Sequence, residues 1–260
     1  MKKQLLIIDP QNDFTSTDGS LYVRGAEKDM TNLVNFIDGN SYAINQIHVT
    51  MDSHSILNIA MPAFWINDNY EHPKPFTIIT LDDVNNGKWM ASKDSLKKYA
   101  KTYVEKLSKN GKYPLCIWPN HCITGTTGYN VNPVLSDSLQ KWAMNRFTPI
   151  NYFYKGTSIM TEHYSVIKAD VAYNGDPTTF INVELLEYLK SANTIYVAGE
   201  ALSHCVANSV RDLVDNGIKA SKITLLIDAT SNVTGFEELG NKFIEEMTAK
   251  GMKLAKTTEF

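Results

Sequence analysis

The stretch 194–217 reads TIYVAGEALSHCVANSVRDLVDNG and joins two patterns of different period. Its first residues, 194–198, form a short β-branched and apolar run, which predicts a buried strand. Apolar residues then recur at helical spacing over 203–216, which predicts a helix that Ser203 caps and Gly217 ends. A buried strand that leads directly into a helix is the repeating unit of a parallel sheet.

The same alternation of strand and helix patterns extends along most of the chain. Because parallel strands are joined by crossover helices, it predicts a three-layer α/β/α fold around a central, mostly parallel sheet of about six strands. We expect strands at 5–8, 44–50, 115–117, 152–154, 194–198 and 223–227. Besides 203–216, we expect helical segments at 30–37, 139–142, 183–189 and 237–250.

The segment 53–114 has a looser pattern, with scattered prolines, polar runs and a lysine-rich, helix-like stretch at 92–109. We interpret this segment as an elaboration on a single domain that spans 1–260. The lysine-rich run 97–109 is interpreted as the solvated face of a helix.

The charge balance argues against a nucleic-acid binder. The 260 residues include 25 Lys+Arg and 28 Asp+Glu, a net charge of −3, whereas phosphate affinity needs a concentrated basic face. The apolar run 5–8 is far too short for a signal peptide or a membrane span, so we expect a cytoplasmic protein without a membrane partner. The three cysteines, Cys116, Cys122 and Cys205, disfavour a disulfide framework and leave room for a free reactive thiol.

Chemistry-bearing side chains follow four of the predicted strands, at the edge where open parallel sheets bind ligands. They are Asp9, Asp52, His54, Lys155 and Cys205. A thiol in the first turn of a helix is biased toward thiolate, and a neighbouring lysine would lower its pKa further. Asp9 could take the thiol proton and return it to a leaving amine. Taken singly, Cys205 also fits a buried small hydrophobe, Lys155 a surface cation and Asp9 a turn former.

Other polar residues have simpler interpretations. We expect His204 to be structural and to point away from Cys205, because adjacent helical residues do not face each other. We expect His163 to be solvated and Cys122 to be buried and inert, although either could lie at the site. The run 125–128 lacks the lysine and the spacing of a phosphate-binding loop, so we interpret it as a turn.

Five fragments of the chain, in order, resemble the isochorismatase-like cysteine hydrolases, the superfamily that contains the nicotinamidases. The fragments are IIDPQNDF at 7–14, DSH at 52–54, WPNHCITGT at 118–126, YKG at 154–156 and VAGEALSHCV at 197–206. This resemblance spans almost the whole chain, and it implies the isochorismatase-like hydrolase fold.

The resemblance implies a catalytic triad of Asp9, Lys155 and Cys205. In it Asp9 shuttles a proton, Lys155 stabilises the thiolate, and Cys205 attacks an amide carbonyl. Ammonia then leaves, and water hydrolyses the thioester. The resemblance also implies an oxyanion hole formed by the backbone amides of Ala201 and Cys205, and a cis peptide bond between Glu200 and Ala201.

Nicotinamidases also hold a divalent metal beside the triad, and Asp52, His54 and His121 match three of its ligands. Met61 stands where a further histidine is expected, and a thioether suits zinc, iron or manganese poorly. Three ligands can still hold a metal with water in the open positions, and His72 is a candidate replacement for the missing one. The resemblance therefore leaves open whether the metal site functions.

Phe14 and Trp118 lie in matching fragments and are expected to bind substrate. The leading hypothesis is a nicotinamidase-like cysteine amidohydrolase that cleaves a small amide, with nicotinamide as the first candidate. One alternative is a related amidase for a carbamoyl or ureido compound, which would use the same triad. Another is a non-catalytic small-ligand binding protein of the same fold, which would have no need for a converging thiol, amine and carboxylate. The resemblance also suggests a homo-oligomer.

Overall fold

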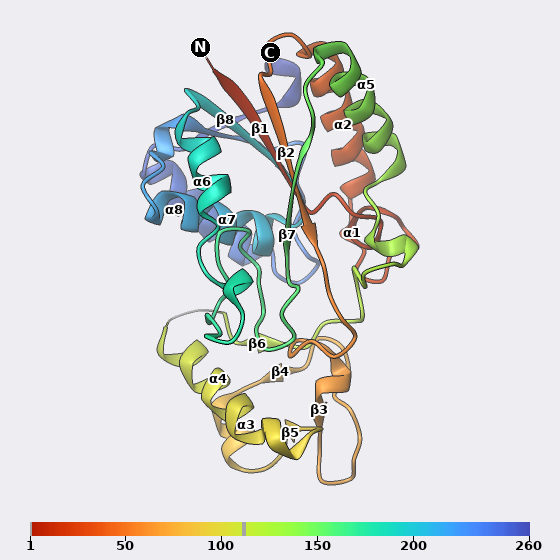
Figure 1. The fold of residues 1–260 in the computed structure, drawn as a ribbon, viewed down its shortest axis with the longest axis vertical. Coiled ribbons are helices and arrows are strands. Elements are labelled where there is room, and N and C mark those ends of the chain that lie inside the picture. Colours follow the sequence, from red (N-terminus) through yellow and green to blue (C-terminus); the bar gives the residue numbers. More distant parts are fainter. Residues whose placement is uncertain (1, 111–112) are drawn as a thin grey trace.

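A six-stranded parallel sheet forms the centre of the computed structural model, which describes residues 2–110 and 113–260 (Figure 1). Its strand order is β10-β9-β8-β1-β2-β7, and every neighbouring pair runs parallel. The strands are β1 (Lys3–Ile8), β2 (Gln46–Asp52), β7 (Asn151–Lys155), β8 (Thr194–Gly199), β9 (Ile223–Leu226) and β10 (Lys253–Ala255). The predicted layered α/β fold is confirmed.

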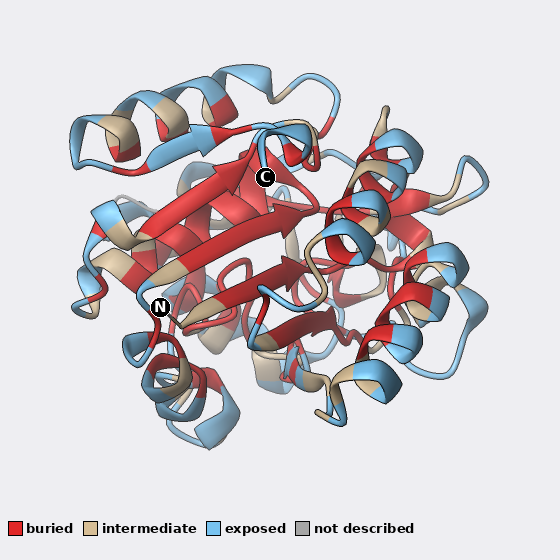
Figure 2. Ribbon diagram, turned by 90° about the horizontal axis from the view of Figure 1, so that it is seen from above, coloured by how far each residue is buried: buried red, intermediate tan, exposed pale blue. Residues whose placement is uncertain are grey.

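Helices cover both faces of this sheet, and in Figure 2 the buried strands lie between helices that expose their outer sides. Successive residues of a strand point to opposite faces, so β1 contributes Leu5 and Ile7 to one core and Leu6 and Ile8 to the other. The first core is closed by α2 (Ala26–Gly39) and α5 (Pro133–Arg146), and the second by α6 (Val183–Lys190), α7 (Ala207–Asp215) and α8 (Glu237–Ala249).

The membership of the central sheet differs from the prediction at one strand. The run 115–117 was expected in the sheet, but β6 (Leu115–Cys116) pairs antiparallel with β4 (Ile78–Ile79) outside it. Leu115 is buried in the hydrophobic core that the elaboration shares with one face of the sheet, which accounts for the apolar pattern of this run. The sixth strand is instead β10, which we did not predict. It is a three-residue edge strand that buries only Ala255, so it has no apolar run to mark it.

The segment 53–114 folds into short elements beyond the carboxyl ends of the central strands, at the lower end of Figure 1. They comprise β3 (Trp65–Ile66), β4, α3 (Leu81–Asn85), β5 (Met90–Ala91) and α4 (Lys97–Lys109). The lysines of α4 are exposed, while its Tyr103 and Leu107 are buried, which fits the solvated face predicted for this run. That the elaboration and the sheet form one domain stays a prediction.

The helix predicted at 203–216 begins in an unexpected way. A π-helical turn, Leu202–Val206, precedes α7, and Ser203 does not cap it. The Ser203 Oγ instead accepts a hydrogen bond from the Val233 N–H at 3.1 Å. Gly217 follows the helix with φ +94°, a left-handed conformation that glycine adopts at little cost.

The remaining helix, α1 (Asn12–Thr15), is a single turn directly after β1. Over the described ranges 2–110 and 113–260, no helix combines the length and the apolarity that crossing a membrane requires.

Candidate active site

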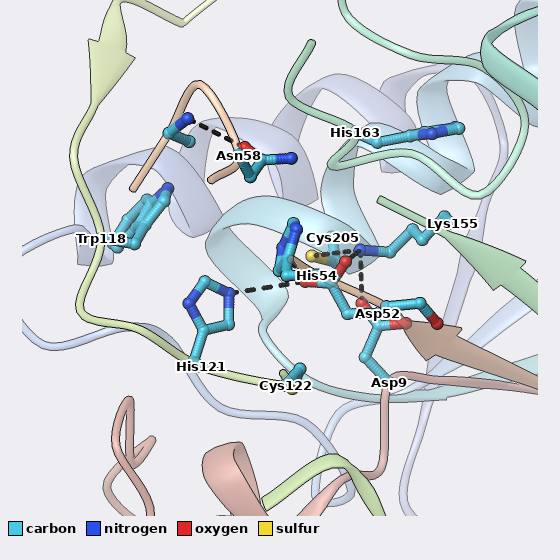
Figure 3. Close-up of polar contacts among 12 residues, drawn as sticks. Asp9, Asp52, His54, Asn58, Trp118, His121, Cys122, Lys155, His163 and Cys205 are labelled. Atoms are coloured by element: carbon cyan, nitrogen blue, oxygen red, sulfur yellow. Dashed lines mark hydrogen bonds and ion pairs between the residues drawn. The ribbon is translucent and has the colours of Figure 1, made fainter. Parts of the chain in front are cut away.

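Asp9, Lys155 and Cys205 meet at the carboxyl ends of the central strands (Figure 3). Asp9 follows β1, Lys155 is the last residue of β7, and Cys205 lies in the π-helical turn after β8. The Lys155 Nζ lies 2.9 Å from Asp9 Oδ2, 3.0 Å from Asp52 Oδ1 and 3.5 Å from Cys205 Sγ. Because β8, β1, β2 and β7 are consecutive in the sheet, their carboxyl ends lie side by side and bring these side chains together.

Local contacts hold the two carboxylates in place. Thr50 of β2 donates its hydroxyl to Asp9 Oδ1 at 2.5 Å and accepts the Asp9 N–H at 2.9 Å. Gly156, directly after β7, has φ +75°, and a Cβ on it would lie 2.6 Å from Asp52 Oδ1 and 2.9 Å from His54 Cε1. Both the backbone conformation and the lack of space therefore require glycine beside the site.

Burial sets the protonation state of the thiol. It raises the pKa of Cys205 well above its usual value, while the Lys155 ammonium opposes the rise. This direction is opposite to the lowered pKa that we expected from a helix start. The reason is that Cys205 is buried and that Asp9 and Asp52 share the positive charge of Lys155. The resting thiol therefore keeps its proton, which a base must accept before the sulfur can attack.

The other two members of the triad are also shifted. Burial raises the pKa of Asp9, against the charge of Lys155, which makes its carboxylate a stronger base than a solvated one. Burial alone would lower the pKa of Lys155, but Asp52 and Asp9 raise it well above its usual value, so the ammonium stays charged.

Asp52, His54 and His121 form a buried group whose ligand atoms all lie within 4.8 Å of one another. His54 Nε2 lies 3.0 Å and His121 Nε2 3.5 Å from Asp52 Oδ2. The His121 Nδ1 lies 2.8 Å from the Pro119 carbonyl oxygen. Donation of Nδ1–H to that carbonyl leaves the lone pair of Nε2 directed at the group, which is the usual orientation of a metal-binding histidine.

The chemistry of this group fits a divalent metal. One carboxylate and two imidazoles are donors that zinc, iron and manganese accept. Burial opposes ionisation of Asp52, but the charges of His54 and Lys155 hold its pKa well below its usual value. Burial likewise opposes a charge on His54, yet Asp52 raises its pKa. The pocket thus attracts a positive charge, and a cation would take the place of the His54 proton.

No described histidine takes the place of the fourth ligand that Met61 replaces in the sequence. Met61 is fully buried, and the candidate replacement, His72, lies outside the three-residue group with its Nδ1 2.7 Å from the Trp65 carbonyl oxygen. The group therefore consists of Asp52, His54 and His121 alone among the described His, Cys, Asp and Glu residues.

A cavity connects the thiol with the metal-binding group. Cys205, Ala201, Asp52 and His121 line it on the polar side. Its other walls include both predicted substrate-binding residues; the aromatic ones are Phe14, Trp118, Tyr164 and His204, and Leu21, Val233 and Glu162 complete the lining. The Phe14 ring lies 5.3 Å from that of His121, and the Trp118 ring 5.1 Å from that of His204. Aromatic walls of this kind favour contact with a flat ring, and Cys205 borders the same cavity.

His204 and Glu162 are polar residues of the cavity that were not assigned to it from the sequence. We expected His204 to point away from Cys205, but both line the cavity, because the turn that carries them is π-helical and wider than an α-helix. Glu162 also lines the cavity, and its buried Oε2 has no hydrogen-bond partner among the described residues. Nothing in the loop sequence marks Glu162, since only the fold of the loop brings it there.

Two other expectations concern residues near the site. His163 was expected to be solvated, but it is buried, and Figure 3 shows it pointing away from Cys205. Cys122 is fully buried as predicted. Its backbone N–H donates to Asp13 Oδ2 at 2.6 Å, and burial raises the pKa of its thiol well above the usual value.

The turn proposed to hold the oxyanion has the predicted backbone form. The peptide bond between Glu200 and Ala201 is cis. The Ala201 carbonyl accepts hydrogen bonds from His204 N–H at 3.0 Å and Val206 N–H at 3.2 Å, which closes the turn around Cys205. Ala201 and Cys205 both border the cavity, as an oxyanion hole requires.

Known proteins that resemble this chain are nicotinamidases and pyrazinamidases. No family model matches the chain. It is 24% identical to the nicotinamidase of Saccharomyces cerevisiae over 97% of its own length and 98% of the yeast protein. It is 30% identical over 133 residues to the nicotinamidase/pyrazinamidase of Mycobacterium tuberculosis, which is 49% of this chain and 61% of that protein.

Solved structures of such enzymes share the fold. The yeast nicotinamidase matches with a TM-score of 0.67 at 22% identity, over 97% of this chain and 99% of the yeast chain. The pyrazinamidase of Pyrococcus horikoshii, solved in complex with zinc, matches with a TM-score of 0.58 at 19% identity, over 98% and 99% of the two chains. The homologues and structural neighbours of this chain are thus nicotinamidases and pyrazinamidases, enzymes that belong to the isochorismatase-like hydrolase superfamily.

Proposed function

We propose that this protein is a nicotinamidase-like cysteine amidohydrolase, which cleaves the C–N bond of a small aromatic amide and releases ammonia. The observation that carries the proposal is the convergence of Asp9, Lys155 and Cys205 at the end of a cavity with aromatic walls. The similarity to the yeast nicotinamidase over nearly the whole length of both chains supports the same reaction class.

In the proposed mechanism, Asp9 accepts the thiol proton as the Cys205 sulfur attacks the amide carbonyl. The negative charge that develops on the carbonyl oxygen is stabilised by the backbone N–H groups of Ala201 and Cys205. Asp9 returns the proton to the leaving nitrogen, the C–N bond breaks and ammonia departs. Water then attacks the thioester, with Asp9 accepting its proton; the C–S bond breaks, and Asp9 passes that proton to the departing sulfur, which gives the carboxylic acid and the free thiol.

Lys155 has a supporting role in this scheme. Its ammonium lies between the Asp9 carboxylate and the Cys205 sulfur, so it offsets negative charge when the thiol proton moves to Asp9. Because Lys155 also contacts Asp52, it holds the triad and the metal-binding group in one arrangement.

Asp52, His54 and His121 are the residues that would hold a divalent metal, zinc, iron or manganese. A metal bound there would offer a Lewis-acidic position for a ring nitrogen of the substrate. Phe14 and Trp118 would contact the substrate ring from the aromatic side of the cavity. Nicotinamide is therefore the first substrate to test. Its flat ring carries a nitrogen that would face the metal-binding group and a carboxamide that would face Cys205.

The two alternatives are less well supported. An amidase for a non-aromatic carbamoyl or ureido compound would leave the aromatic walls without a role. A non-catalytic binding protein would bury a thiol, an ammonium and two carboxylates against one another without using them, and burying charges is costly. A cytoplasmic location and a homo-oligomeric state are part of the proposal only on the basis of the sequence.

The test is ammonia release from nicotinamide by the purified protein supplied with zinc, iron or manganese. Cys205→Ala should lower the turnover number at least about 1,000-fold, because it removes the nucleophile and leaves the rest of the site in place. Cys116→Ala is the matched control, since it removes a buried thiol outside the cavity and should retain activity. Near-native activity in Cys205→Ala would refute the mechanism, and release from carbamoyl compounds but not from nicotinamide would favour the first alternative.

A further inference from the structure

A second pair of carboxyl groups is buried directly behind the oxyanion turn. Glu200 is fully buried and precedes Ala201, while Asp29, in the first turn of α2, is 6% exposed. Neither residue is among the described residues that line the cavity, so neither can touch the substrate.

Ser231 links this pair to the turn. Its Oγ donates to Asp29 Oδ2 at 2.5 Å, and its N–H donates to Glu200 Oε2 at 3.2 Å. Its carbonyl oxygen accepts the Leu202 N–H at 2.8 Å, and Leu202 is the first residue of the π-helical turn that carries Cys205. One serine therefore contacts both carboxyl groups and the backbone of the turn.

Burial favours a proton on this pair of carboxyl groups. Burial raises the pKa of Glu200 well above its usual value, and the charge of Asp29 raises it further. Burial raises the pKa of Asp29 to about 6, while hydrogen bonds from Ser231 and Glu200 oppose the rise. From the surrounding elements, Asp228 raises the pKa of Asp29 and Lys28 lowers it. These shifts favour Glu200 as the proton donor and Asp29 as its acceptor.

A protonated carboxyl group can bridge two partners in a way that a carboxylate cannot. The Glu200 Oε2 accepts the Ser231 N–H, and the buried Oε1, which has no other hydrogen-bond partner among the described residues, can donate a proton to Asp29. This arrangement fixes the side chain of Glu200 at both ends and, with it, the backbone entering the cis bond to Ala201. The hydrogen bonds that Asp29 accepts are charge-assisted, so they are stronger than neutral ones.

We propose that Glu200 and Asp29 are positioning residues for the hydrolysis: the Glu200 carboxyl, linked to Asp29 and to the turn through Ser231, fixes the turn that presents the Ala201 and Cys205 amides to the oxyanion. This inference rests on the proposed amidase function. It assigns to the pair an effect on the transition state and none on substrate binding, because the oxyanion forms only during the reaction.

Two substitutions of similar size separate hydrogen bonding from packing. Glu200→Gln keeps a neutral donor and an acceptor, whereas Glu200→Leu fills the space without either. We expect Glu200→Gln to retain the wild-type turnover number within about threefold, and Glu200→Leu to lower it about tenfold or more at an unchanged KM. Both variants should show wild-type circular dichroism. A fully active Glu200→Leu, or a Glu200→Gln as impaired as Glu200→Leu, would overturn the proposal.

Two readouts need no turnover, so they separate failure of this inference from failure of the amidase proposal. The infrared difference between wild type and Glu200→Gln at neutral pH should contain the C=O stretch of a protonated carboxylic acid, and its absence would overturn the assigned proton. Alkylation of Cys205 by iodoacetamide, followed by mass spectrometry, should change more than about threefold in Glu200→Leu but not in Glu200→Gln, because the turn carries the sulfur. Equal alkylation rates in all three proteins would refute the positioning role, whereas a wild-type protein that hydrolyses no amide would refute the amidase proposal alone.

Discussion

Replacement of Lys155 by methionine tests the electrostatic account of the site most directly. The Lys155 side chain is 1% exposed and lies 2.9 Å from Asp9 and 3.0 Å from Asp52. Methionine has a similar length and no charge, so Lys155→Met leaves two buried carboxylates without their cation. Breaking a buried ion pair in this way costs about 3–5 kcal/mol, and we expect a loss of free energy of unfolding of that size at neutral pH.

The loss should depend on pH, and its sign follows from the two carboxylates. In the wild type Asp52 is held ionised, so its contribution to stability is present above its ordinary pKa and lost at lower pH. In the variant the folded-state pKa of Asp9, which burial already raises, rises further, and that of Asp52 rises from its lowered value although His54 still opposes the rise, so the folded variant binds more protons than the folded wild type does. As pH falls, the variant therefore recovers up to about 1.4 kcal/mol per pH unit for each carboxylate.

Urea unfolding followed by circular dichroism, in EDTA to exclude metal, measures this difference from about pH 8 to about pH 5. Lys98→Met on the exposed face of α4 is the matched control and should change stability little at any pH. A deficit in Lys155→Met that stays equal at both ends of the range would refute the reasoning, because it would mean that lost packing and not unpaired charge destabilises the variant.

Two further predictions concern the metal-binding group and the carboxyl pair. His121→Ala should weaken zinc binding more than about 100-fold, measured in competition with a chromophoric chelator, since loss of even an outer-shell partner costs about 10–100-fold. Met61→His should raise the metal occupancy measured by elemental analysis. Unchanged zinc affinity in His121→Ala would remove this histidine from the site. Glu200→Gln should stabilise the protein more at about pH 8 than at about pH 5. Because burial raises the folded-state pKa of Glu200, the wild type loses free energy of unfolding as pH rises above the ordinary pKa of a glutamate, and glutamine, which does not titrate, avoids this loss. A stability gain in urea that does not grow with pH would contradict a protonated Glu200.

The elements that the sequence predicted well are those whose signal is local. β1 and β8 are continuous apolar runs because parallel strands covered on both faces must be apolar throughout, so their sequences alone mark them. The run 115–117 carries the same signal but belongs to a small outer sheet, because apolarity reports burial and not the identity of the partner strand. The opposite error occurred at β10, which is short and largely exposed.

The candidate site divides in the same way. Asp9 and Lys155 were predicted because each stands directly after a strand pattern, and Cys205 because it lies at the start of the helix pattern that follows a strand; neighbouring strand ends lie together. His204 was misplaced because a π-helical turn depends on how the chain packs, and a helical sequence pattern cannot distinguish it from an α-helix. Glu162 reaches the cavity from a long loop, whose course is decided by contacts such as the one between its N–H and the Tyr103 hydroxyl at 2.9 Å.

The sequence by itself determined that a carboxylate, an amine and a thiol stand at the ends of parallel strands, since strand periodicity and chain order are local properties. Only the tertiary structure decided their protonation, because a pKa depends on burial and on charges that arrive from distant segments. The same holds for the pairing of Glu200 with Asp29, which are far apart in the chain and meet only because α2 packs against the sheet beside the end of β8.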